Sequence, residues 1–440
     1  MKLVSTRNTN NKVSFLQALL SCMPEDGGLY VPYEEQDLRS WILHLDENSS
    51  FSNVAGSLTA ALLKEELSPA VSERIADSAF KDYAPRLRQL DDGLFQLELF
   101  HGPTGSHRDF GLLWLASTLE HVLTMQGKTA TVLTPSMGKG GRSVAAAFGN
   151  KKRLKAIVIY PRGYAKGYDE KFTMQKGGSI YPVEMDGSYA EIERLVREVY
   201  QDRELVSKYN LTLANTINIG RIIPQTFFYP FAFTRIKKRS SGNIYYAIPS
   251  GNYGNITAGL YAWKFRLPVS GFITDATASL TSDVHGFCVC LDSMIPLAER
   301  GPADPATPAT PSNIERLEQV FSISPALMRS FLFPVHVNHE RINEIIGTVY
   351  HKYGIMFDSQ TATVYEAALK SNRISQKGAE TLVLISKDHP AFESERLRAA
   401  CGEAPIIPER LKNMDVPIKD VHLINGKKEE ILQILQTITE

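Results

Sequence analysis

Residues 101–111 are His101-Gly102-Pro103-Thr104-Gly105-Ser106-His107-Arg108-Asp109-Phe110-Gly111, and they join two segments of opposite character. Leu97-Glu98-Leu99-Phe100 precedes them, and residues 111–126 follow with apolar side chains at helical spacing. From residue 95 onward, short β-branched runs alternate with helical patterns. The expected strands are 129–134, 156–160, 179–183, 244–248 and 381–385, and the expected helices are 111–126, 142–150, 189–201 and 255–264. This alternation predicts an α/β fold with parallel sheets covered on both faces.

The region before residue 95 has a different pattern. Apolar residues at helical spacing over 13–20, 54–67 and 70–80 predict helices, and residues 24–32 predict a turn followed by an extended segment. We therefore expect a mostly helical N-terminal region over 1–95, a first α/β lobe over 96–235 and a second over 236–440. Within the second lobe, the proline-rich residues 301–313 predict a linker or surface loop.

The segment 97–110 resembles the part of threonine synthases that leads into the cofactor lysine. Further similar strings are Gly-Gly-Leu-Tyr-Val-Pro at 27–32, Asn-Thr-Ile-Asn-Ile-Gly-Arg at 215–221 and Ser-Asn-Ile-Glu-Arg-Leu at 312–317. The resemblance covers almost the whole chain. It implies the architecture of fold type II pyridoxal-phosphate (PLP) enzymes, related to tryptophan synthase β, with two parallel-sheet lobes. The family reaction, a step of amino-acid biosynthesis, converts O-phosphohomoserine and water to threonine and phosphate.

One residue departs from the family where the chemistry depends on it. The family pattern continues with Phe-Lys-Asp-Phe, whereas this chain has His107, Arg108, Asp109 and Phe110. A Schiff base needs a neutral amine, which a lysine supplies once its pKa is lowered. Arginine stays protonated and delocalised, so Arg108 cannot form an ordinary internal aldimine.

A glycine-rich segment at 248–259 follows an expected strand and begins an expected helix. Its glycines let the backbone approach a ligand, and a helix N-terminus directs several N–H groups at one point, which suits a phosphate. The residues alone equally allow a tight turn capped by asparagine. The resemblance to the family loop Ser-Gly-Asn-Phe-Gly-Asn implies that Gly251, Asn252, Gly254 and Asn255 hold the phosphate of PLP.

A second glycine-rich loop, at 134–143, occupies the place where the family has Ser-Gly-Asp-Thr-Gly for the substrate carboxylate. It precedes an expected helix, so anion binding is plausible here too, and a structural turn with two solvated cations is the alternative. The sequence matches neither a Walker A loop nor a full dinucleotide fingerprint. The substrate-binding candidates are Ser136, Gly138, Lys139, Gly140, Gly141 and Arg142.

Near the C-terminus, the family carries Thr-Ala-His-Pro-Ala, whose threonine meets the pyridine nitrogen of the cofactor. Here Ser386-Lys387-Asp388-His389-Pro390-Ala391 keeps only His-Pro-Ala. One alignment places Lys387 at the ring, where a cation would oppose protonation of the pyridine nitrogen, and the other places Ser386 there. Both residues are therefore candidate cofactor contacts.

Another lysine could supply the missing amine. The candidates in altered or adjacent segments are Lys139, Lys166, Lys171, Lys176 and Lys387. Lys139 is favoured because its loop should face the same cleft, and a solvated side chain is the alternative for each of the five.

Composition gives no sign of a nucleic-acid or membrane partner. The 440 residues carry 48 Lys+Arg and 48 Asp+Glu, with 43% hydrophobic residues, as in ordinary globular chains. No apolar signal core or run of about 18 apolar residues is present. The four cysteines lack metal-ligand spacing and predict free buried thiols, a reducing compartment and a cytoplasmic protein with no metal.

Three functional hypotheses remain from the sequence. The first is a threonine synthase using PLP in which Arg108 is compensated. The second is a non-catalytic homologue that binds a phosphorylated or amino-acid-like small molecule, and the third is an enzyme of different chemistry in which Arg108, Lys139 and Arg142 clamp an anionic substrate. The chain is expected to act as a monomer or homodimer.

Overall fold

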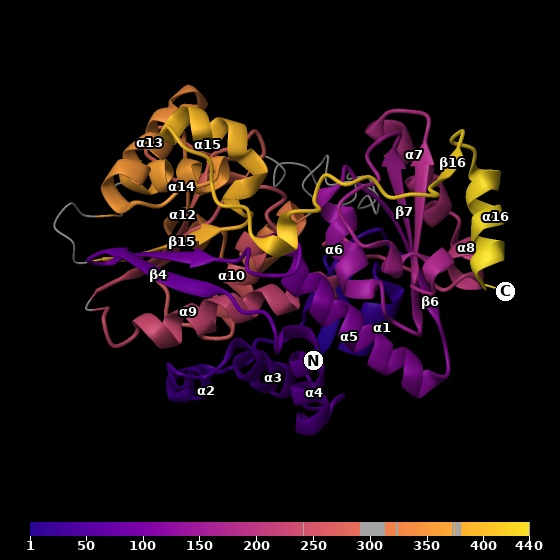
Figure 1. The fold of residues 1–440 in the computed structure, drawn as a ribbon. Coiled ribbons are helices and arrows are strands. Elements are labelled where there is room, and N and C mark those ends of the chain that lie inside the picture. The colour runs from indigo at the N-terminus through magenta and orange to yellow at the C-terminus, as the bar shows by residue number, and fades with distance from the viewer. Residues whose placement is uncertain (241, 291–312, 323, 372–373, 375–379, 440) are drawn as a thin grey trace.

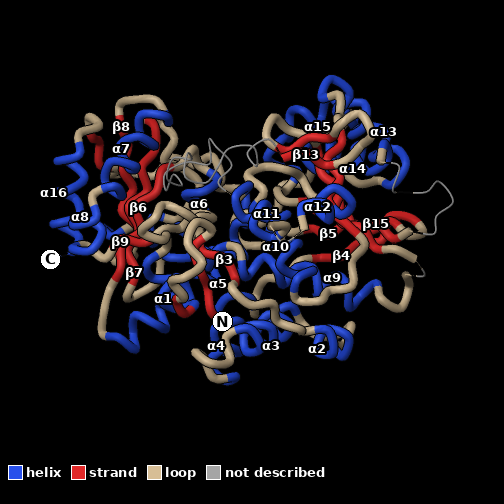
Figure 2. Tube along the Cα trace, turned by 180° about the vertical axis from the view of Figure 1, so that it is seen from behind, coloured by secondary structure: helices blue, strands red, loops and turns tan. Residues whose placement is uncertain are grey.

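Two parallel sheets organise the chain in a computed structural model (Figures 1 and 2). The structure describes residues 1–240, 242–290, 313–322, 324–371, 374 and 380–439. The sheets lie side by side, each between layers of helices, and the N-terminal region packs beneath them in the view of Figure 1. The predicted α/β architecture of two parallel-sheet lobes is confirmed.

The first sheet has five parallel strands in the order β16-β8-β7-β6-β9. Its strands are β6 (Ala130–Pro135), β7 (Leu154–Pro161), β8 (Ile180–Met185), β9 (Leu211–Thr212) and β16 (His422–Ile424). Its helices are α5 (Arg108–Gln126), α6 (Lys139–Phe148), α7 (Tyr189–Gln201), α8 (Arg203–Lys208) and α16 (Lys428–Thr439). Helix α7 begins with a capping box, in which Ser188 and Glu191 satisfy each other's backbone amides.

The second sheet has six strands in the order β14-β11-β10-β15-β5-β4, parallel except for the edge pair β4–β5. Its strands are β4 (Arg86–Asp91), β5 (Leu94–Glu98), β10 (Ile244–Ala247), β11 (Gly271–Asp275), β14 (Leu332–Val335) and β15 (Thr381–Ser386). Its helices are α9 (Phe228–Ile236), α10 (Gly254–Lys264), α13 (Ile342–Tyr353), α14 (Ser359–Lys370) and α15 (Ser394–Cys401).

The N-terminal region contains a small antiparallel sheet as well as helices. Strand β1 (Lys2–Ser5) pairs with β2 (Val13–Ser14) and β3 (Tyr30–Pro32). The helices are α1 (Phe15–Ser21), α2 (Arg39–His44), α3 (Phe51–Leu62) and α4 (Pro69–Phe80). Further short elements are β12 (Leu280–Ser282), β13 (Cys288–Cys290), α11 (Ile314–Val320) and α12 (Pro325–Phe331), and several 3-10 helices lie in the connections.

The strands and helices expected from the sequence all form, with ends shifted by up to three residues at most boundaries. The largest difference lies at the end of α3, which stops at Leu62, five residues before the expected end, and α3, α5 and α6 each begin three residues before the apolar pattern does. The proline-rich residues 301–312 lie outside the described residues. The expected α/β topology follows from burial, because strands covered on both faces are almost entirely apolar, as β7 and β15 are.

The lobes divide the chain differently from the boundaries predicted at 95/96 and 235/236. Strand β4, expected in the N-terminal region, is the edge of the second sheet, and β5, which spans the boundary expected at 95/96, pairs with β15 there. Strand β16 and helix α16, expected in the second lobe, return to the first sheet, where β16 pairs with β8. Such pairings join residues far apart in sequence, so local patterns carry no record of them.

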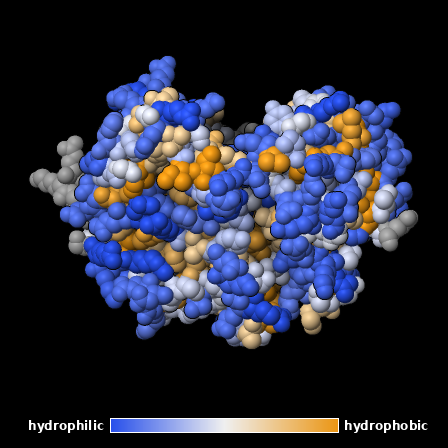
Figure 3. Space-filling model, viewed as in Figure 1, coloured by the Kyte–Doolittle hydropathy of each residue, from blue (hydrophilic) through white to orange (hydrophobic). Residues whose placement is uncertain are grey.

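The cores lie on both faces of each sheet, and the outer surface is mainly polar. Ile157 and Val183 of the first sheet pack with Ile431 and Leu435 of α16. Figure 3 shows hydrophilic residues over most of one face, with apolar residues in small scattered groups. No helix among the described residues is long and apolar enough to cross a membrane. All four cysteines are free and buried, as predicted.

Trp114 on α5 connects the N-terminal region to the first lobe. Its side chain is fully buried, its Nε1 donates to Thr59 Oγ1 at 3.2 Å, and its ring lies 6.0 Å from Phe15 and 6.2 Å from Phe227 between centroids. We expect Trp114→Ala to lower the free energy of unfolding by about 3–5 kcal/mol. Urea denaturation followed by circular dichroism measures the loss. Met125→Ala, at a 75% exposed position of the same helix, should change stability by less than about 0.5 kcal/mol, and equal effects of the two variants would contradict this role.

Candidate functional site

A cavity of about 310 Å³ opens where the carboxyl ends of β6 and β10 face each other, the usual place for ligands in open parallel sheets. It is lined by His107, Arg108, Leu112, Thr134, Pro135, Gly140, Val144, Tyr189, Ala214, Asn215, Thr216, Arg221, Gln225, Gly251, Asn252, Asn255, Gln360 and Lys387. Of these described residues, Arg108, Arg221 and Lys387 are cationic and none is a carboxylate. The cavity therefore suits an anion.

The loop at 250–255 turns the chain from β10 into α10 at one wall of this cavity. Gly251 and Tyr253 have positive φ values of 48° and 60°, and α10 starts at Gly254. Glycine adopts such a backbone without strain, and the turn brings the N-terminus of an 11-residue helix to the cavity. Gly251, Asn252 and Asn255 line the cavity, and Gly254 begins the helix behind them.

Side chains from three other segments of the chain hold this loop in place. Asn252 donates from Nδ2 to Thr216 Oγ1 at 2.8 Å, and Asn255 donates to Gln225 Oε1 at 3.2 Å. On the other side, the Asp275 carboxylate accepts from the backbone amide and the hydroxyl of Ser250, at 2.8 and 2.6 Å. The loop is therefore rigidly positioned before any ligand binds, which lowers the entropy cost of binding.

Lys387 enters the cavity beside this loop. Its side chain is buried, and its amine donates to the carbonyl oxygen of Pro249. A Cβ placed on Gly251 would lie 3.4 Å from Lys387 Nζ, so the amine lies against the first glycine of the loop. Burial lowers the pKa of Lys387 to about 8, Asp275 opposes this shift, and the charge of Arg108 reinforces it.

Arg108 faces a buried carboxylate just after β15. Its Nη1 donates to Ser106 Oγ at 3.0 Å and lies 3.4 Å from Asp388 Oδ1, while Lys139 Nζ lies 3.2 Å from Asp388 Oδ2. Ser106 itself donates to Asp388 Oδ1 at 2.8 Å. Asp388 thus binds two cations, and we call Arg108, Lys139 and Asp388 the ion cluster.

Asp388 is ionised because of these cations. Burial alone would raise its pKa, but the charges of Arg108 and Lys139 hold the pKa well below its usual range. His107 contributes no charge: burial lowers its pKa to about 4, and its Nδ1 lies 3.9 Å from Asp388 Oδ1, too far for a hydrogen bond. The ion cluster carries a net charge of about +1 near neutral pH, counting two cations and one carboxylate.

Arg221 is a fully enclosed cation in the cavity wall. Its Nη1 donates to the carbonyl oxygen of Ala214, while its buried Nε has no hydrogen-bond partner among the described residues. Burial lowers the pKa of Arg221 to about 9, and repulsion from Arg108 adds to the shift. A Cβ on Gly111 would lie 2.9 Å from this Nε, so only glycine in α5 leaves room for the guanidinium.

In the loop at 134–143, the side chain of Ser136 accepts hydrogen bonds from the backbone N–H groups that an anion would need. Ser136 Oγ accepts from the amides of Gly138 and Gly141, at 3.0 and 2.8 Å, and so occupies the first turn of α6. Among the substrate-binding candidates, only Gly140 lines the cavity. Lys139 turns to Asp388, and Arg142 donates to the carbonyl oxygen of Met414 at 3.0 Å.

The structure separates the two candidates for the cofactor ring. Ser386, the last residue of β15, accepts from Gln96 Nε2 at 2.9 Å and from Thr361 Oγ1 at 3.1 Å inside the second lobe, whereas Lys387 lines the cavity. Lys139, the candidate substitute for the missing lysine, is 42% exposed and does not line the cavity.

The sequence analysis assigned no functional role to Asp388, which binds Arg108 and Lys139. It also assigned none to Arg221 and Tyr189, which line the cavity. Asp388 stands one residue beyond Lys387, where the family pattern has alanine, so comparing that position with position 108 could have revealed a paired change. Arg221 lies in a string that resembles the family but was given no role. Tyr189 carries no signal in its local sequence.

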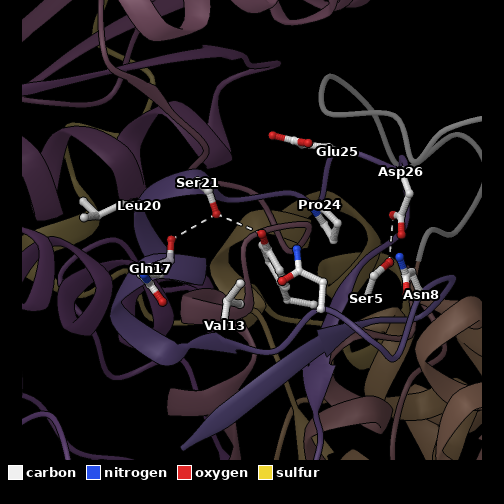
Figure 4. A pocket seen from close by; sticks show the side chains of 11 residues that line it. Ser5, Asn8, Val13, Gln17, Leu20, Ser21, Pro24, Glu25 and Asp26 are labelled. Atoms are coloured by element: carbon white, nitrogen blue, oxygen red, sulfur yellow. Dashed lines mark hydrogen bonds between the residues drawn. The ribbon is translucent and has the colours of Figure 1, made fainter.

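A larger cavity, of about 600 Å³, lies apart from this site in the N-terminal region (Figure 4). Its polar side chains pair with each other: Ser5 donates to Asp26 at 2.8 Å and Ser21 to Tyr30 at 3.1 Å. It has no cluster of cations. Among the described residues, no group of three or more His, Cys, Asp or Glu side chains could hold a metal ion.

Comparison with known proteins gives the family. The profile "Pyridoxal-phosphate dependent enzyme" matches residues 83–387, and the profile "Threonine synthase N terminus" matches residues 2–80. The chain is 28% identical to threonine synthase of Escherichia coli (strain K12) over 421 residues, 95% of each chain. It is 33% identical to threonine synthase of Serratia marcescens over 282 residues, 64% of this chain and 65% of that protein.

Two solved threonine synthase structures have the same fold as this chain. The crystal structure of threonine synthase from Escherichia coli superposes with a TM-score of 0.79 at 26% identity and covers 100% of both chains. A PLP-bound threonine synthase from Brucella melitensis gives 0.81 at 23% identity over 99% of each chain, which supports the fold. The chain therefore belongs to the family of pyridoxal-phosphate-dependent enzymes of fold type II. Within it, the N-terminal match and these relatives place it among the threonine synthases, as the sequence predicted.

The site fits one end of the family cofactor and not the other. The loop at 250–255 has the backbone and the helix N-terminus that a phosphate requires. At residue 108 the chain offers a protonated guanidinium bonded to Asp388, where a covalently bound cofactor would need an amine. The site does not fit a cofactor attached through residue 108.

The ion cluster yields a stability prediction. Asp388→Asn leaves Arg108 and Lys139 without their counter-charge. Removing one partner of a buried pair costs about 3–5 kcal/mol, and we expect about 2 kcal/mol here because Arg108 and Lys139 are 39% and 42% exposed. Urea denaturation at neutral pH measures this loss, and Asp186→Asn, in the exposed pair with Arg162, is the control.

The lowered pKa of Asp388 determines how its stabilising effect changes with pH. The pKa of Asp388 is lower in the folded chain than in the unfolded chain. Its contribution to the free energy of unfolding is therefore complete above the unfolded pKa of about 3.9 and is lost as the pH falls below that value. The stability difference between the original chain and Asp388→Asn should therefore shrink below about pH 4. A difference that is independent of pH would show that Asp388 acts through packing.

Proposed function

We propose that this threonine synthase homologue binds a small phosphorylated molecule in the cavity at the ends of β6 and β10 and does not catalyse the ordinary threonine synthase reaction. The observation that carries this proposal is that Arg108, Arg221 and Lys387 line one cavity whose described residues include no carboxylate. The loop at 250–255 supplies neutral backbone donors beside these three cations. This matches the second of the sequence-based hypotheses.

Each part of the cavity has a distinct task in binding. The loop holds the phosphate through backbone N–H groups and the N-terminus of α10. Arg221, rigid and buried, holds a second anionic or strongly polar group, because a guanidinium offers several donors in a fixed plane. Arg108 is held by Asp388 and Ser106 and adds positive charge to the cavity lining.

The threonine synthase reaction needs a group that carries protons, and residue 108 does not provide one. When PLP is bound in this family, it supplies the electron sink for carbanion chemistry. A group at residue 108 would have to accept and return protons, which a guanidinium does far less readily than an amine. Lys139 does not replace it, since its amine is bound to Asp388 outside the cavity lining.

Calorimetry tests the binding function. O-phosphohomoserine, with a phosphate and a carboxylate, should bind the purified protein, and Arg221→Met should weaken binding by about 10- to 100-fold, since hydrogen bonds to charged groups contribute about 1.5–3 kcal/mol. Arg162→Met, which removes a 66% exposed arginine, should leave the affinity unchanged. Unchanged affinity in a folded Arg221→Met variant would contradict the assigned role.

A turnover assay tests the absence of the family reaction. With PLP and O-phosphohomoserine present, we expect no phosphate release above the rate without protein, because residue 108 cannot exchange a proton. Detection of both phosphate and threonine at equal rates would overturn this part of the proposal. An active threonine synthase assayed in parallel is the positive control.

A further inference from the structure

Lys387 contributes positive charge to the cavity, and as an amine it can also form a covalent bond, which the arginines cannot. It is the only lysine among the described residues that line the cavity. The backbone amide of His107 donates to the carbonyl oxygen of Lys387 at 2.7 Å, so residue 387 runs directly beside the segment that carries Arg108. The chain thus has an amine next to the position where the family amine is missing, with its Nζ directed toward Pro249 and Gly251.

The surroundings of Lys387 favour the neutral, nucleophilic form of its amine. Its side chain is 6% exposed, and its hydrogen bond goes to a carbonyl oxygen. The nearby acidic groups are already engaged: Asp275 with Ser250, Asp388 within the ion cluster, and Asp358 as the cap of α14, where it accepts from Thr361. Desolvation with incomplete charge compensation is how proteins activate lysine nucleophiles.

We propose that Lys387 forms an imine with the carbonyl group of a small phosphorylated aldehyde whose phosphate is held by the loop at 250–255. This inference rests on the proposed function, because the loop must hold the phosphate first. Since Lys387 Nζ lies against Gly251, the carbonyl must lie within a few bonds of the phosphate.

The reaction balances without another reagent. The lone pair of the neutral Lys387 amine forms the N–C bond while the carbonyl π electrons move to oxygen, giving a carbinolamine. The C–O bond then breaks, and the oxygen leaves as water with the two protons that the amine nitrogen loses. Nothing is oxidised or reduced. Effective capture follows from holding the two reacting groups together in one cavity.

Reductive trapping tests the proposal. The full-length protein is incubated with glycolaldehyde phosphate and sodium cyanoborohydride, which reduces the imine to a stable secondary amine, and the adduct is located by peptide mass mapping. We expect one main adduct, on Lys387, and its loss in Lys387→Met. Lys171→Met, at a 63% exposed lysine, should retain the adduct. Glycolaldehyde without phosphate should give much less of it.

The pH dependence separates an imine from a simple ion pair. The pKa of Lys387 is about 8, lowered by burial, with Asp275, Asp388 and Asp358 opposing the shift and Arg108 adding to it. His107 is uncharged in this range, its pKa being about 4. The trapping rate should therefore rise with pH and reach half its maximum near pH 8, while the affinity for inorganic phosphate falls over the same range.

The outcomes are distinguishable. Adducts on Lys139 or spread over exposed lysines would overturn the inference. Absence of an adduct while inorganic phosphate still binds, as measured by calorimetry, would overturn the imine and leave the binding function standing. Failure of phosphate to bind at all would remove both. Inorganic phosphate should also block trapping competitively, and a thermal melt of Lys387→Met checks that the variant is folded.

Discussion

The buried carboxylate of Asp388 is the constraint on which the arrangement of the site depends. A carboxylate removed from water must be compensated by cations and hydrogen bonds, and Arg108, Lys139 and Ser106 supply them. These partners come from the segment before and at the start of α5 and from α6 beside the first sheet, whereas Asp388 follows β15 of the second sheet. The ion cluster therefore ties the two lobes together at the rim of the cavity and fixes where each cation lies.

This constraint makes Arg108 and Asp388 depend on each other. An arginine at 108 alone would place an unneutralised charge beside His107 and Lys387, and an aspartate at 388 alone would be a buried unpaired charge. Together with Lys139 they form a compensated group, of which only Arg108 lines the cavity with Lys387 and Arg221. The loop at 250–255 is independent of this cluster, because the donors it offers are backbone N–H groups at the start of α10.

The sequence predicted those features that local patterns determine. Alternating strands and helices, the turn from β10 into α10 and the family followed from periodicity, glycine spacing and short strings. The membership of β5 and β16 in their sheets did not, because pairing partners lie far away in the chain. Which of Ser386 and Lys387 faces the cavity also required the structure: successive residues at the end of a strand point to opposite sides, so an uncertainty of one residue reverses the assignment. The burial of Arg221 depends on Gly111 of another helix, which no local pattern records.

A cavity with this charge distribution is more stable with a ligand than without one. Arg221 and Lys387 have lowered pKa values, which means that the folded chain disfavours their charged forms and is destabilised by them at neutral pH. An anion that binds only the folded state returns the missing counter-charge and stabilises the fold by mass action. Burial of the two cations has two effects. The charge of Arg221 lacks a counter-ion and attracts an anion, and a fraction of Lys387 is neutral. Replacing either buried cation by an apolar residue would remove the cost of burying its charge, so their presence together in one cavity favours a site that binds an anion.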